Sequence, residues 1–219
     1  MAFWMTYDWT EPMARRTNRE TDMRARIAAA AARIMAEDGV DDFALAKRKA
    51  AKQLGAVETH SLPRNDEIEA ELRAYRALYQ SEDHPELVDE LRRLALDAMK
   101  LLEPFHPYLT GPILKGIAGP YAEIDLQLFP DSAKEVEIFL LDRGLPFATR
   151  EVRRYSGDRT LGVSVITLDW EGVPLRLSLF DPRDERVAVK TSQAGRTMER
   201  AGISEVSALL VGEKAPKNG

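Results

Sequence analysis

Two carboxylates, Glu123 and Asp125, stand two residues apart in a segment with the alternating pattern of a β-strand. Successive side chains point to opposite faces of a strand, so both acids are expected on one face, with Ile124 and Leu126 in the core. Paired carboxylates can hold Mg²⁺, a hard cation that prefers oxygen ligands and leaves coordination positions for substrate phosphates. The alternative is an ordinary exposed strand face.

A turn rich in glycine precedes the two acids. Gly111 lies twelve residues before Glu123, and Lys115 stands beside Gly116, which follows Gly111 by five residues. This order and spacing resemble the signature of the nucleotidyltransferase superfold of the DNA polymerase beta type. The resemblance implies that Gly111, Lys115 and Gly116 bind the nucleotide, because glycine lets backbone amides approach a phosphate closely.

The same resemblance, which covers about residues 100–185, implies a fold and a reaction. The expected fold class is α+β, with an N-terminal helical region followed by a nucleotidyltransferase-like mixed sheet flanked by helices. The implied reaction transfers a nucleotidyl group from an NTP to a nucleic-acid or protein acceptor. Glu123 and Asp125 are then the catalytic residues and the Mg²⁺ ligands of a two-metal phosphoryl transfer.

Departures from the family pattern support a second interpretation. Pro112 stands where the family has a small residue that contacts phosphate, and proline has no N–H to donate. The strand expected to carry a third acid has Arg176 and Ser178 on its polar face, while Asp169 and Asp181 lie near its ends. An arginine beside two carboxylates forms a charge-assisted pair without any metal. The chain is therefore either an active transferase or a degenerate relic, a pseudoenzyme, that binds a nucleotide or a partner.

The first half of the chain has helical periodicity. Apolar spacing predicts helices over about residues 23–38, 42–54, 68–79 and 87–102. At Pro104 this pattern gives way to short apolar runs separated by glycine and proline. We therefore expect a disordered leader over residues 1–19, a helical domain over 20–103, a nucleotidyltransferase-like domain over 104–211 and a disordered tail over 212–219.

The second half alternates strand and helix signals. Strands are expected around residues 147–152, 163–168 and 173–180, the last two joined by a turn at Glu171-Gly172. Ser132 followed by Glu135 predicts a capping box that opens a helix ending at Gly144. A terminal helical segment is expected over residues 192–210.

The second predicted helix concentrates the basic residues Lys47, Arg48, Lys49 and Lys52, with no acid among them. This patch is either a nucleic-acid contact or a solvated face paired with the acids of residues 66–71. Residues 26–55 also resemble the start of a TetR-type regulator, which implies a helix-turn-helix DNA-binding function. Pro63 departs from that pattern, because it falls where the recognition helix should run.

Composition excludes several classes of site. The chain has no cysteine, three histidines and a formal net charge of −5, which excludes disulfides and thiolate metal sites and favours a cytoplasmic protein. His60, His84 and His106 are too scattered for a zinc site, and only His106 is expected near the Gly111 turn. No apolar run approaches transmembrane length, so no membrane partner is expected.

Overall fold

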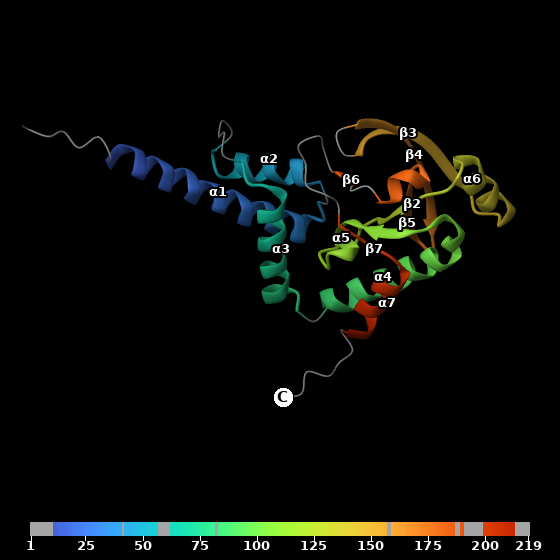
Figure 1. The fold of residues 1–219 in the computed structure, drawn as a ribbon. Coiled ribbons are helices and arrows are strands. Elements are labelled where there is room, and N and C mark those ends of the chain that lie inside the picture. Colours follow the sequence, from blue (N-terminus) through green and yellow to red (C-terminus); the bar gives the residue numbers. More distant parts are fainter. Residues whose placement is uncertain are drawn as a thin grey trace, which may run out of the picture. The chain divides into compact units, whose positions relative to one another are not determined.

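The computed structural model describes the chain from residue 11 to residue 212, apart from residues 41, 57–61, 82, 157–158, 187–188 and 191–198. The chain folds into two compact units, unit 1 (Met1–Ser81) and unit 2 (Glu82–Gly219). Among the described helices, none has the length and apolar character needed to cross a lipid bilayer. The expected α+β class is confirmed: helices form the N-terminal part, and further helices flank a mixed sheet (Figure 1).

Unit 1 is built from helices α1 (Glu11–Asp38), α2 (Phe43–Gln53) and α3 (Asn65–Tyr79). α1 packs against both of the others, and their interface buries the apolar side chains Ile27, Ala31, Ala46, Ala50, Ile68 and Leu72. Asp42 caps α2, since its carboxylate accepts hydrogen bonds from the amides of Ala44 and Leu45. The predicted helices 23–38, 42–54 and 68–79 are therefore present.

α1 begins earlier than the sequence pattern suggested. Residues 11–19, expected to belong to a disordered leader, form its first turns. The segment contains good helix formers such as Ala14, Arg15 and Arg16, and Pro12 lies in the first turn, where a missing N–H costs nothing. The remaining leader residues 1–10 and the predicted tail residues 213–219 lie outside the described residues.

Unit 2 contains a seven-stranded sheet with the order β6-β3-β4-β5-β2-β1-β7. β2 and β5 are parallel, and the other neighbouring strands are antiparallel. The strands are β1 (Tyr108–Thr110), β2 (Ile124–Leu128), β3 (Phe147–Ser156), β4 (Arg159–Trp170), β5 (Val173–Leu179), β6 (Val189–Lys190) and β7 (Arg200–Ala201). The helices are α4 (Asp83–Leu101), η1 (Glu103–Phe105), α5 (Gly111–Leu114), α6 (Ala133–Asp142), η2 (Pro182–Arg186) and α7 (Ile203–Gly212).

The core of unit 2 lies between the helices and one face of the sheet. Ile124, Leu126 and Leu128 of β2 point into a buried cluster that also contains Met99 of α4 and Val206 of α7. Side chains alternate along a strand, so Asp125 and Gln127 lie on the opposite face. We call the part of this second surface around Asp125 the polar face of the sheet; farther along, the same surface carries a smaller buried apolar cluster that includes Phe129, Val165 and Phe180.

The division between the units differs from the predicted boundary at residue 104. The compact units divide between Ser81 and Glu82, which assigns α4 to the sheet. The buried stripe of α4, including Leu91, Ala95 and Met99, belongs to the same apolar cluster as the strands. Helical periodicity predicts that a helix buries one face, but it does not indicate which partner covers that face.

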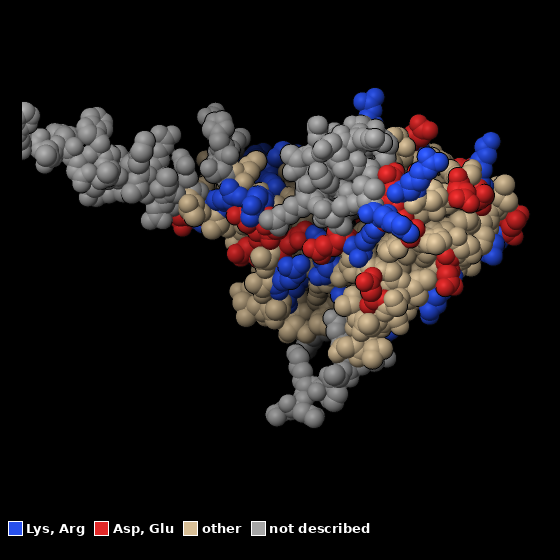
Figure 2. Space-filling view, viewed as in Figure 1, with Lys and Arg blue, Asp and Glu red and all other residues tan. Residues whose placement is uncertain are grey.

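Several local predictions in unit 2 are confirmed. Ser132 is the N-cap of α6, since its side chain accepts a hydrogen bond from the amide of Lys134, whereas the reciprocal bond of Glu135 that a capping box requires is not found in the described part of the chain. β4 and β5 form the expected hairpin, in which Glu171 and Gly172 both have positive φ, 53° and 85°. On the face of the molecule shown in Figure 2, basic and acidic side chains are intermingled.

Candidate functional site

The two predicted acids lie at the start of β2, in the middle of the sheet. Asp125 is opposite Thr110 of β1 and opposite Arg176 of β5. Directly opposite residues in neighbouring strands point to the same face, so Asp125 and Arg176 meet on the polar face. Glu123 immediately precedes β2 and reaches the same guanidinium.

Arg176 is held by both acids. Its Nε and Nη2 donate to Oδ1 and Oδ2 of Asp125 at 2.5 and 2.7 Å, and its Nη1 lies 3.0 Å from Oε2 of Glu123. Every guanidinium nitrogen therefore faces a carboxylate oxygen, in the planar fork that bidentate pairing requires. The side chains of Arg176 and Asp125 are 29% and 18% exposed, so solvent screens this contact only in part. We call these three residues the acid–arginine triad.

The electrostatics of the triad keep Arg176 charged. Burial opposes the charge, but the hydrogen bonds and the negative charge of Asp125, with a further contribution from Glu123, raise the pKa of Arg176 above its ordinary value. One positive charge thus stands between two negative ones. In this way Arg176 partly neutralises the two carboxylates, as a divalent cation does in a metal site with paired acids.

Gly111 belongs to the same site. It follows β1 directly and has φ of +78°, and a Cβ built on it would lie 3.0 Å from Oδ2 of Asp125. The structure therefore brings the first glycine of the predicted motif to one of its acids. The space beside Gly111 is already taken by the Asp125 carboxylate.

Gly116 faces a different side chain. A Cβ at this position, where φ is +68°, would lie 3.3 Å from Nη2 of Arg92 in α4. Arg92 is buried, and it donates to the carbonyl oxygens of Ile113 and Leu114 at 3.3 and 3.4 Å. Arg92 thus stabilises the Gly111–Gly116 turn by hydrogen bonds to its backbone carbonyl groups. Lys115, the C-cap residue that follows α5, is half-buried.

Sequence reasoning missed Arg92. The signal was present, because Val88, Arg92, Ala95 and Met99 follow helical spacing, which places Arg92 on the buried face of α4. An arginine in an apolar stripe needs acceptors, and the carbonyl groups at the end of a short helical turn provide them.

The residues at the site do not fit the implied Mg²⁺ ion. Both predicted ligands are engaged by Arg176, and the described part of the chain has no group of three or more acids or histidines placed to share an ion. Asp169 accepts a hydrogen bond from the amide of Gly172, and Asp181 accepts one from the amide of Arg183. Each of these two acids stabilises a turn beyond an end of the β5 strand instead of joining the triad.

His106, which was expected near the Gly111 turn, lies beside Glu185. It precedes β1, whereas Gly111 follows it, and its Nδ1 lies 3.4 Å from Oε1 of Glu185. Tyr108 donates to the same oxygen at 2.8 Å, and this bond, together with burial, raises the pKa of Tyr108. Nε2 of His84 lies 3.0 Å from the carbonyl oxygen of Ala118, two residues after Gly116. His60 lies outside the described residues.

The predicted basic patch on α2 is partly neutralised within unit 1. Lys47 donates to Oδ1 of Asn65 at 2.7 Å, and burial lowers the pKa of this lysine. Lys49 lies 3.6 Å from Asp38, while Arg48 and Lys52 are exposed. The segment where the TetR-like interpretation expects its recognition helix, residues 57–65, lies largely outside the described residues, and the next described helix, α3, has two acids in its first turn. Acids at that position repel nucleic-acid phosphates.

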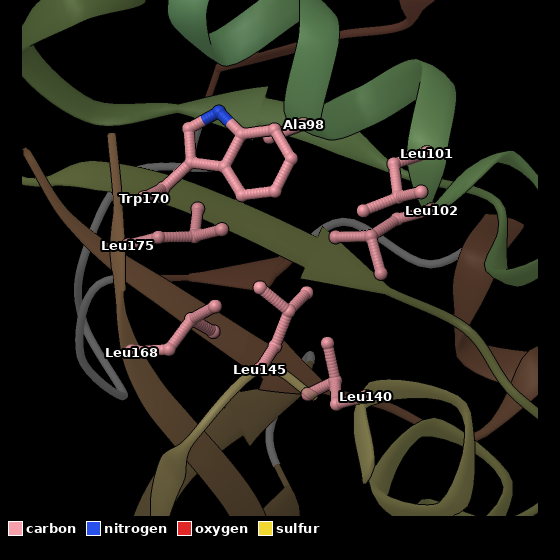
Figure 3. Close-up of a pocket in the computed structure, with 8 residues that line it drawn as sticks. All are labelled: Ala98, Leu101, Leu102, Leu140, Leu145, Leu168, Trp170 and Leu175. Atoms are coloured by element: carbon pink, nitrogen blue, oxygen red, sulfur yellow. The ribbon is translucent and has the colours of Figure 1, made fainter. Parts of the chain in front are cut away.

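A small apolar pocket lies on the helix-covered side of the sheet, away from the triad (Figure 3). Its lining residues are Ala98, Leu101, Leu102, Leu140, Leu145, Leu168, Trp170 and Leu175. The indole of Trp170 spans the gap towards α4 and donates to the carbonyl oxygen of Leu94 at 3.1 Å. A pocket without polar lining groups offers nothing to a nucleotide phosphate, so we interpret it as a packing feature of the core.

Comparison with protein-family models, with curated proteins and with solved structures found no match for this chain. The site is therefore interpreted from its own geometry.

Proposed function

We propose that unit 2 is a nucleotidyltransferase-like domain that acts by binding a partner and does not transfer nucleotides. The observation that carries this proposal is the acid–arginine triad, in which Arg176 occupies the side of Asp125 and Glu123 where a metal ion would be held. A guanidinium between two carboxylates stabilises the sheet permanently, with no need for a diffusible cation.

Displacing Arg176 by a metal ion is energetically unfavourable. The ion would break the charge-assisted contacts of Arg176 and leave a guanidinium that is 29% exposed without a counter-charge. Breaking this partly exposed ion pair costs about 2–3 kcal/mol when one partner remains in place. Mg²⁺ also keeps most of its water in such sites and gains little from two ligands. The competition therefore favours the arginine.

The glycine turn supports the same conclusion. In the implied family role, Gly111 and Gly116 leave room for phosphate groups. Here a Cβ at either position would contact Asp125 or Arg92, which shows that internal side chains use the space. Pro112, in the first turn of α5, offers no N–H to an oxyanion. We therefore favour a protein partner over a nucleotide as the ligand of unit 2.

Isothermal titration calorimetry of the full chain with Mg²⁺ and a non-hydrolysable NTP analogue tests this proposal. The expected result is no saturable heat from Mg²⁺ with or without the analogue. Asp125→Asn, which keeps the shape of the side chain, is the control for any heat that appears. Saturable, analogue-dependent Mg²⁺ binding that Asp125→Asn abolishes would overturn the proposal. So would NTP turnover that disappears in both Glu123→Gln and Asp125→Asn.

A further inference from the structure

We draw no further inference here: the strongest candidate, the exposed apolar face of helix α6 formed by Ile138 and Leu141, carries none because nothing in the described part of the structure shows what covers it.

Discussion

Each unit contains an arginine–carboxylate fork among its described residues, and the two forks differ in what surrounds them. In unit 1, Arg24 of α1 donates Nε and Nη2 to the Glu67 carboxylate at 2.9 and 2.7 Å. In unit 2, Arg176 faces Asp125 in the same way but also reaches Glu123. In the first fork Glu67 also has Nε of Arg64 at 4.0 Å, so positive charge is in excess, whereas the second fork leaves one negative charge in excess.

The two carboxylates, Glu67 and Asp125, also differ in the backbone that surrounds them. Glu67 accepts a further hydrogen bond from the amide of Arg64 and so completes the capping of α3. The Asp125 carboxylate lies beside Gly111, which begins a turn and has a left-handed backbone conformation. An arginine–carboxylate pair alone therefore does not indicate a functional site. Excess acid beside a glycine turn makes the unit 2 fork the candidate functional centre.

The largest expected effect is on the fork of unit 2. Arg176→Ala leaves two neighbouring carboxylates without a cation, and we expect the free energy of unfolding of unit 2 to fall by about 2–3 kcal/mol. Adding Asp125→Asn should recover part of this loss, because it removes the remaining repulsion and gives a non-additive double-mutant cycle. Urea unfolding of the four chains measures the coupling. Strict additivity would contradict the triad.

The next effect concerns the glycine beside Asp125. Gly111→Ala adds a Cβ 3.0 Å from a carboxylate oxygen at φ of +78°, whereas Gly144→Ala, at φ of +67°, meets no atom within 4 Å. Both variants should lose about 1 kcal/mol from the left-handed backbone, and Gly111→Ala about 1 kcal/mol more from the crowded carboxylate. The same urea unfolding experiment compares them. Equal losses would show that the Asp125 contact is unimportant.

A smaller effect is expected for the fork of unit 1. The side chains of Arg24 and Glu67 are 33% and 35% exposed, so solvent screening limits the loss in Arg24→Ala to about 1 kcal/mol or less. The hydrogen bond from Arg24 lowers the pKa of Glu67, and the hydrogen bond from the Arg64 amide lowers it further. Burial of the carboxylate acts in the opposite direction and is outweighed.

This lowered pKa fixes the sign of a pH effect. The contribution of Glu67 to stability is complete above the pKa of the unfolded chain, about 4.3, and is lost as pH falls through the lower folded value. The stability difference between the natural chain and Glu67→Gln should therefore shrink as pH is lowered below about 5. A difference that grows under acid would contradict the assignment.

The smallest effect is expected on the exposed face of α2. Arg48→Ala and Lys52→Ala should change the free energy of unfolding by less than about 0.5 kcal/mol, since both side chains are exposed. Salt-dependent binding of a DNA duplex that these variants abolish would instead favour the helix-turn-helix interpretation.

Local chemistry was largely predictable from the sequence. The alternation around Asp125, the cap at Ser132 and the turn at Glu171 depend on neighbouring residues only, and each was found where it was expected. Arg176 was also named as a neighbour of the acids, because it occupies the polar face of the next strand.

Long-range relations were less predictable. The assignment of α4 to the sheet and the placement of His106 beside Glu185 depend on packing between distant residues. The short strands β1 and β7 lack enough residues for a periodic signal. The contact of Gly116 with Arg92 joins a loop to a helix, and residue spacing gives no information on such a pair.

The most direct test of the central claim, that Arg176 takes the place of a metal ion, is the Mg²⁺ dependence of unfolding in Arg176→Asp. This substitution places a third carboxylate opposite Asp125 in the sheet. Mg²⁺ should leave the thermal unfolding midpoint of the natural chain unchanged. It should raise the midpoint of the destabilised variant by several degrees, because the ion relieves the repulsion between three acids. A natural chain whose midpoint rises with Mg²⁺, and loses that response in Asp125→Asn, would contradict the claim.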